Sequence, residues 1–202
     1  GFIDSLDFNV NGSKVEWSYL NNKIDICVIY LKKPVKKGDS ISITTPFKVK
    51  IPSGRFSRLG HLGQSYQITQ WFPKPAVYDK DGWHPMSYLD QGEFYSEFGD
   101  YDVSITVPKN YVLMATGDLQ NKDELAFLDK KAKLTAKLIK ENKLPFRDSF
   151  GRKDMSFPKS SLEKKTLRFV QKNVHDFAWF TDKRYHVLRG EIELERKNVT
   201  SW

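Results

Sequence analysis

Alternating apolar and polar residues, interrupted by turn residues, characterise the first 31 positions of the chain. Residues 6–10 (LDFNV) lead into Asn11-Gly12, a dipeptide that favours the type I′ turn of a two-residue hairpin, and residues 13–19 (SKVEWSY) follow it. Asn21 and Asn22 then precede residues 23–31, where apolar side chains again occupy every second position. Because the connections are short, the pattern predicts strands joined as an antiparallel meander.

A further, longer strand is predicted over residues 40–51, after a break at residues 34–38. Its alternating positions hold apolar or β-branched residues, namely Ile41, Ile43, Thr45, Phe47, Val49 and Ile51. Pro46 lies inside this run. Since proline has no backbone N–H, we expect the strand to lie at a sheet edge or to contain a bulge.

The second half of the chain repeats the strand pattern around one helical segment. Strands are predicted over residues 101–107, 111–116, 166–174 and 185–194, with a turn at 108–110 that returns the chain after the first of them. We expect the partners of the strand at 185–194 to lie beyond Trp202.

One amphipathic helix is predicted over residues 123–141. Asn121 stands at the N-cap position and Glu124 follows three residues later, as in a capping box. The residues that fall on one apolar face of this helix are Leu125, Leu128, Ala132, Ala136 and Ile139. Together with the strands, this helix predicts a mainly β fold in one domain: an antiparallel β-sandwich or saddle-shaped double sheet with one inserted helix.

Residues 64–107 are unusually rich in aromatic residues, proline and glycine. Neither a regular helix nor a plain strand accommodates so many prolines and glycines. We therefore expect an ordered excursion that leaves a sheet and re-enters it at residues 101–107. Long ordered loops of this kind are commonly functional, although the aromatic side chains also serve packing.

Three stretches carry a resemblance to a known family. They read QWFPKPAVYDKDGWHP, GEFYSEFGDYDVSITVPKNYVLMATGDL and KTLRFVQKNVHDFAWF, and they cover just under a third of the chain. In these stretches the sequence resembles the N-terminal domain of M1-family zinc aminopeptidases of the gluzincin class, and is most similar to bacterial members. The resemblance implies a non-catalytic domain, truncated at both ends, that caps the active-site cleft of its own catalytic domain.

The same resemblance implies one substrate contact within this chain. In the family, the N-terminal domain contributes a Gln or Glu that helps to hold the free α-amine of a peptide substrate. Spacing back from Pro73 places Gln64 at that position, with Gln67 and Gln70 as the next choices. A side-chain carbonyl can accept a hydrogen bond from an ammonium without adding charge, which suits this role. The alternative is that Gln64 is an ordinary polar loop residue.

The catalytic groups of that family are not in the sequence. M1 enzymes bind zinc through an H-E-x-x-H motif and a later glutamate, and no two of His61, His84, His175 and His186 have this spacing. We therefore expect no catalytic residue and no metal ligand in this chain, and place the zinc in the catalytic domain. The pair His175-Asp176 is interpreted as a hydrogen-bonded turn, and residues 79–82 as a turn rather than a calcium loop.

Cysteine content and charge limit the kinds of site and partner that we expect for this chain. Cys27 is the only cysteine, which excludes an internal disulfide and favours a structural thiol. Residues 122–172 contain 15 lysines and arginines against 7 acidic residues, which equals the whole net charge of +8. Because the surplus is local, we expect no nucleic-acid partner, although this stretch is where one would bind. No apolar run reaches the length of a transmembrane helix.

A second function remains open from the residues alone. A free-standing β-sandwich could bind sugars or a peptide by stacking them on Trp71, Trp83 and Tyr88. This hypothesis requires that those rings be exposed, whereas burial of all three would remove it.

Overall fold

The structure is a computed structural model that describes residues 1–55, 58–89, 92, 95–143, 156–195 and 197–202. It is mainly β and sandwich-like, with two larger antiparallel sheets and one helix, as the sequence predicts. The first sheet has the strand order β12 (Gly99–Pro108), β15 (Lys164–Val174), β14 (Asp118–Leu119). The second has the order β13 (Val112–Ala115), β16 (Trp179–Asp182), β9 (Ser65–Ile68), β8 (Gly60–Leu62).

The main core lies between these two sheets. Its buried side chains come from β12, β13, β15 and the residues flanking them, and they are Ile105, Val107, Tyr111, Leu113, Leu167, Phe169 and Phe177. Each strand directs alternate residues inward, so the period of two in the sequence is also the period of burial. The indole of Trp71 adds to this core from the aromatic excursion and donates a 2.9 Å hydrogen bond to the carbonyl of Phe177.

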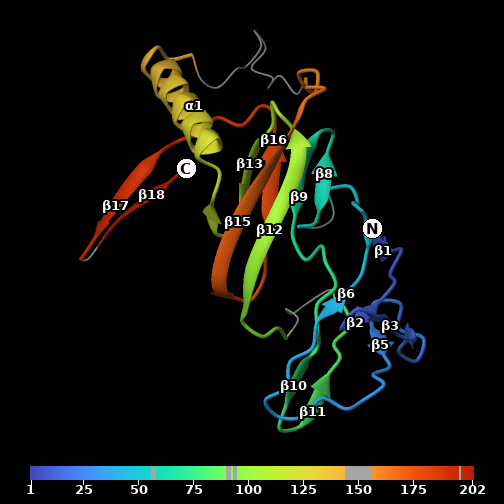
Figure 1. The fold of residues 1–202 in the computed structure, drawn as a ribbon. Helices are drawn as coiled ribbons and strands as arrows, with labels where there is room; N and C mark the ends of the chain where they lie inside the picture. Colours follow the sequence, from blue (N-terminus) through green and yellow to red (C-terminus); the bar gives the residue numbers. More distant parts are fainter. Residues whose placement is uncertain (56–57, 90–91, 93–94, 144–155, 196) are drawn as a thin grey trace.

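The remaining strands form small sheets, and Figure 1 shows those of the N-terminal region gathered near the β10–β11 hairpin, away from the helix. The pairs are β1 (Phe2–Asp4) with β7 (Lys48–Lys50), β2 (Asn9–Val10) with both β3 (Ser13–Lys14) and β6 (Ile43–Thr44), β4 (Trp17–Tyr19) with β5 (Cys27–Ile29), β10 (Val77–Asp79) with β11 (Gly82–His84), and β17 (Gly190–Leu194) with β18 (Lys197–Ser201).

The hairpin at Asn11-Gly12 is confirmed. Asn11 and Gly12 have φ values of 49° and 78°, the left-handed conformation that a type I′ turn requires at both central positions. The predicted long strand at residues 40–51 is wrong, because β6 and β7 lie in two different sheets on either side of Pro46. The hydroxyl of Thr45 donates to the carbonyl of Pro46 and accepts from the N–H of Asp7, so a side chain replaces ladder bonds at this break.

Two expected connections also differ. Residues 108–110 do turn, but β12 and β13 enter opposite sheets instead of forming a hairpin. The last predicted strand begins only at Gly190, and β17 pairs with β18 inside the chain, so its partner does not lie beyond Trp202. The sequence analysis also missed β16, which joins β13 to β9.

The helix α1 spans Lys122–Lys140, close to the predicted bounds, but the predicted capping box is wrong. Asn121 makes no side-chain cap; its amide bonds the backbone of Thr166 and Arg168 in β15 instead. Glu124 is buried against Lys165. The buried face is rotated from the predicted one: Leu128 and Ala132 are buried, whereas Ala136 and Ile139 are exposed. No described helix is long and apolar enough to cross a membrane.

Candidate functional site

Gln64 lies at the turn between β8 and β9, and its side chain accepts hydrogen bonds from within the chain. The residue is exposed, and its Oε1 accepts hydrogen bonds from the ammonium of Lys183 and, at 3.4 Å, from the hydroxyl of Ser160. Lys183 is only 5% exposed and also donates to the carbonyl of Pro158 and to Ser160 Oγ. The amide oxygen that was predicted to accept a hydrogen bond from a substrate ammonium therefore accepts one from the ammonium of Lys183 in the same chain.

Aromatic rings complete the surroundings of this lysine. Its Nζ lies 5.3 Å from the ring centroid of Tyr111 and 5.9 Å from that of Phe157. A cation near ring faces is stabilised electrostatically, and three oxygen acceptors match the three N–H donors of an ammonium. This corner of the molecule therefore holds one primary ammonium, that of Lys183, between oxygen acceptors and aromatic rings.

The two fallback glutamines do not join Gln64. Gln67 lies within β9, half-buried, opposite Gly60 and Phe180 in the neighbouring strands. Gln70 follows β9 with φ of 51°, in the left-handed region, where it ends the strand. Of the three, Gln64 is the exposed one, and it alone contacts Lys183 in the described part of the chain.

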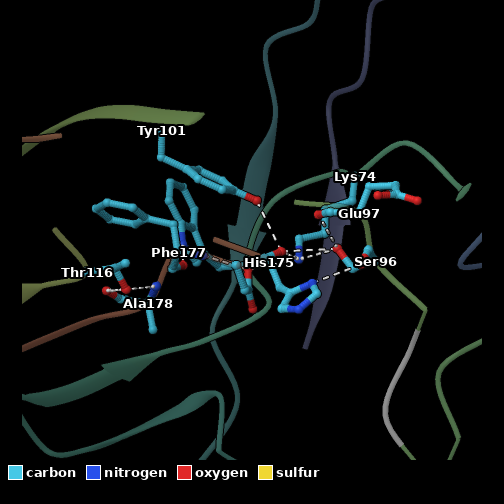
Figure 2. Close-up of polar contacts among 10 residues, drawn as sticks. Lys74, Ser96, Glu97, Tyr101, Thr116, His175, Phe177 and Ala178 are labelled. Carbon is cyan, nitrogen blue, oxygen red and sulfur yellow. Dashed lines mark hydrogen bonds and ion pairs between the residues drawn. The ribbon is translucent and has the colours of Figure 1, made fainter. Parts of the chain in front are cut away.

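A second polar group, the Lys74 cluster, consists of Lys74, Ser96, Tyr101, His175 and Asp176. Figure 2 shows its centre, the carbonyl of His175, which accepts from Lys74 Nζ at 2.7 Å, Ser96 Oγ at 3.1 Å and Tyr101 OH at 3.2 Å. Lys74 also forms an ion pair of 3.1 Å with Asp176. The imidazole Nδ1 of His175 lies 3.0 Å from the backbone carbonyl of Ser96, which makes this nitrogen the donor.

The geometry of the Lys74 cluster opposes a catalytic serine. Ser96 Oγ accepts a 3.3 Å hydrogen bond from Lys74 Nζ, which also contacts the carbonyl of His175 and the carboxylate of Asp176, so the lysine is placed as a donor to the serine and not as its base. Burial raises the pKa of the Tyr101 hydroxyl, and the charge of Asp176 raises it further, so Tyr101 remains a donor. The cluster thus connects the aromatic excursion to the turn after β15. The turn predicted at His175-Asp176 is present.

The aromatic hairpin, β10–β11, is the most exposed apolar feature of the excursion. Tyr78 and Trp83 face each other across the two strands with ring centroids 5.0 Å apart, and each is 66% exposed. Tyr88 nearby is 64% exposed, and its backbone N–H donates to Asp25. Trp71, in contrast, packs in the core. Two of the three rings proposed for stacking are therefore exposed.

A polar pair stiffens this hairpin. His84 Nε2 lies 2.7 Å from Asp79 Oδ1, which also accepts the backbone N–H of Asp81. These bonds, with that from His84 contributing most, hold the pKa of Asp79 below its usual value. Gly82 has φ of 103°, a conformation that a residue with a side chain rarely adopts. The run at 79–82 is a hairpin turn, as predicted.

The remaining candidate residues occupy structural positions. Cys27 is half-buried in β5, and burial raises the pKa of its thiol, which disfavours the thiolate that a nucleophile needs. His61 stacks on Tyr66, with ring centroids 5.8 Å apart. Among the described residues, no group of three or more His, Cys, Asp or Glu side chains is placed to hold a metal ion.

Sequence reasoning missed both Lys183 and Lys74. Neither carries a local signal, because each bonds to residues about a hundred positions away: Gln64 lies 119 residues from Lys183, and His175 lies 101 residues from Lys74. No protein-family model, curated protein or solved structure matches this chain. A function for this chain therefore has to be inferred from the contacts of its described residues and from its sequence pattern.

Proposed function

We propose that this chain is the non-catalytic β domain of a zinc-dependent M1-type aminopeptidase, where it caps the active-site cleft and helps to hold the free N-terminus of the substrate. The observation that carries the proposal is the position of Gln64. The residue is exposed at the β8–β9 turn, and its amide oxygen accepts from a primary ammonium, that of Lys183. A peptide N-terminus presents the same chemical group.

The resemblance described above supports the same assignment. The segment that would end in a buried strand in the family is β12 here, with Val103, Ile105 and Val107 directed toward the core. The zinc, its ligands and the general base would be supplied by the catalytic domain. The role of this chain is then to bind and orient the substrate amine, so that only peptides with a free N-terminus are positioned correctly.

The first test is the sequence of the gene downstream of Trp202. An H-E-x-x-H motif followed by a later glutamate supports the proposal, whereas a stop codon or an unrelated domain contradicts it. The second test uses the intact protein with an aminoacyl nitroanilide and its N-acetylated counterpart. We expect zinc-dependent hydrolysis of the free amine only, and no hydrolysis by residues 1–202 alone.

Variants of the intact protein separate the role of Gln64 from a general effect. Gln64→Ala should raise KM for the free amine with a smaller change in kcat, and Gln64→Glu should largely retain binding, because a carboxylate also accepts from an ammonium. Gln120→Ala is the matched control, since Gln120 is exposed and, among the described residues, its side chain bonds only to the nearby carbonyl of Asp118. Equal KM values for all these proteins would remove Gln64 from the substrate site.

A second candidate function rests on the aromatic hairpin. Its exposed rings, Tyr78 and Trp83, could stack on a sugar or a peptide in a free-standing binding module. Affinity electrophoresis of the chain in soluble polysaccharides, with Trp83→Ala beside the wild type, tests this candidate. Retardation that is lost in Trp83→Ala supports a carbohydrate module, and equal mobility in every gel rejects it.

A further inference from the structure

In the part of the chain that the structure describes, the strand β12 has one edge without a partner. It is the first strand in the order β12-β15-β14, and Figure 1 shows β15 along one of its flanks. The register places Val103 opposite Phe169 and Ile105 opposite Leu167. One residue beyond the strand, the N–H of Lys109 donates to the carbonyl of Glu163, which continues the same ladder. Residues of β12 at alternate, odd-numbered positions therefore direct their backbone groups toward β15.

Hydrogen bonds on the side of β15 that faces away from β12 independently give the same direction for the backbone groups of β12. The carbonyl of Arg168 accepts from the N–H of Gln120, and the N–H of Arg168 donates to Asn121. Arg168 thus directs its backbone toward the β14 side. Its partner in β12 is Ser104, so the backbone N–H and carbonyl of Ser104 point away from β15.

The same alternation applies to Asp102 and Thr106, so three residues present free backbone donors and acceptors along this edge. In the ranges that the structure describes, no residue forms a backbone bond with them on that side. Natural proteins usually protect such an edge with lysine, proline or a central bulge. Between Asp100 and Val107 the sequence has no lysine and no proline, and the bulge lies at the start of the strand, between Gly99 and Tyr101.

The side chains along this edge complement those of an identical strand. The outer face carries small or neutralised polar groups: Ser104, Thr106, and Asp102 with its 2.6 Å ion pair to Arg168. The inner face carries Val103 and Ile105. An antiparallel copy with Ser104 on the two-fold axis sets Asp102 opposite Thr106 and Val103 opposite Ile105. No like charges then oppose each other, and apolar residues meet apolar residues.

We propose that the β12 edge pairs with β12 of a second copy of this chain, antiparallel about a two-fold axis at Ser104. The two three-stranded sheets become one continuous sheet of six strands. The contact is isologous, since each copy gives and receives the same set of backbone bonds. A single strand pair is a small interface, so dissociation in the micromolar range or weaker is expected.

Substitutions at Ser104 test this pairing in the full 202-residue chain. Ser104→Pro removes the outward N–H and no intramolecular bond, whereas Ser104→Ala retains the backbone and removes only the hydroxyl. In sedimentation velocity over a range of concentrations, the wild type and Ser104→Ala should form dimers. Ser104→Pro should dimerise at least tenfold more weakly, with an unchanged circular dichroism spectrum. A wild type that remains monomeric at every concentration overturns the proposal.

Cross-linking keeps the proposal testable if Ser104→Pro does not fold. In a Cys27→Ala background, Ser104→Cys should form a disulfide-linked dimer under mild oxidation, because hydrogen-bonded strand partners bring their Cα atoms about 5.5 Å apart. Thr166→Cys is the matched control, since Thr166 is exposed on the central strand of the same sheet. Equal cross-linking of the two variants, or association that persists in a folded Ser104→Pro, assigns the contact to another surface and overturns the proposal.

Discussion

The carboxylate of Glu124 in α1 lies 2.6 Å from the ammonium of Lys165 in β15, and these side chains are only 6% and 13% exposed. The lysine also lies over the ring of Phe127, 4.3 Å from its centroid. This pair fixes the first turn of the helix to the central strand of a sheet. It also explains why Glu124 does not complete a capping box, since its side chain turns away from the helix N-terminus.

Removing one member of this pair should be strongly destabilising. Glu124→Gln leaves a buried ammonium without its counter-charge, and breaking such pairs costs about 3–5 kcal/mol of unfolding free energy. Urea unfolding followed by circular dichroism measures the loss. Glu124→Leu combined with Lys165→Met should recover most of it, because apolar groups of similar size replace both charges. A double variant as unstable as Glu124→Gln would show that the charges themselves hold the helix.

The pair of Asp182 and Arg184 should make stability depend on pH. Asp182 is 3% exposed and Arg184 contacts it at 2.8 Å. Burial opposes ionisation of Asp182, but the side-chain and backbone bonds from Arg184 outweigh it and hold the pKa below 3.8. A carboxylate with a lowered pKa in the folded state contributes stability above the unfolded pKa, and this contribution is lost as the pH falls through the folded one.

Arg184→Met removes the guanidinium bonds and the charge that oppose the effect of burial, so the pKa of Asp182 should rise. We expect a lower Tm than wild type near neutral pH, with a difference that shrinks as the pH falls toward about 4. Calorimetry across this range is the measurement. Arg168→Met is the control: its partner Asp102 is exposed, so Tm should change little at any pH. Parallel Tm curves for Arg184→Met and wild type would contradict the assignment.

The Lys74 cluster should govern how firmly the aromatic excursion is held. Lys74→Met removes the donor to the carbonyl of His175 and the ion pair with Asp176. We expect a loss of about 1 kcal/mol, because the carbonyl of His175 keeps its bonds from Ser96 and Tyr101 and Asp176 remains accessible to water. Limited proteolysis should cut near residues 85–98 earlier in this variant. Lys80→Met, which changes a fully solvated lysine of the hairpin, should leave both the stability and the cleavage pattern as in wild type.

Two tryptophans of the excursion should differ sharply in their effect on stability. Trp71 packs in the core and bonds to Phe177, so Trp71→Ala should cost about 3 kcal/mol. Trp83 is exposed on the hairpin, and Trp83→Ala should change the unfolding free energy by about 0.5 kcal/mol or less. Chemical denaturation of the two variants side by side checks this. A large loss in Trp83→Ala would place that ring in the folding core and not on a binding surface.

Local chemistry explains which elements could be predicted from the sequence. The hairpin at Asn11-Gly12 and the extent of α1 depend on neighbouring residues, so turn propensity and periodicity were sufficient. The strands β12 and β15 are long enough for their alternation to be unambiguous. Residues 40–51 also alternate, but one proline interrupts them, and periodicity alone does not show that the halves join different sheets.

The candidate site was less predictable because it is assembled from distant segments. The family resemblance and the spacing from Pro73 led to the prediction of Gln64, and the structure places this residue at an exposed turn. No residue near it in the sequence indicates that it contacts Lys183. Likewise, the charge of Glu124 suggested a cap, whereas its partner Lys165 becomes a neighbour only after β15 docks against the helix. Both contacts, Gln64 with Lys183 and Glu124 with Lys165, form only when segments that are far apart in the sequence pack together.

The strand order in both larger sheets has a consequence for synthesis on the ribosome. β15 joins β12 to β14, and β16 joins β13 to β9, so both sheets are joined by strands from late in the chain. β12 ends at Pro108 and its partner β15 at Val174, whereas β9 ends at Ile68 and its partner β16 at Asp182. At translation speeds of about 5–20 residues per second, the apolar faces of β9, β12 and β13 wait roughly 3–23 s for their partners. During that interval the apolar faces of these strands lack the strands that cover them in the folded chain.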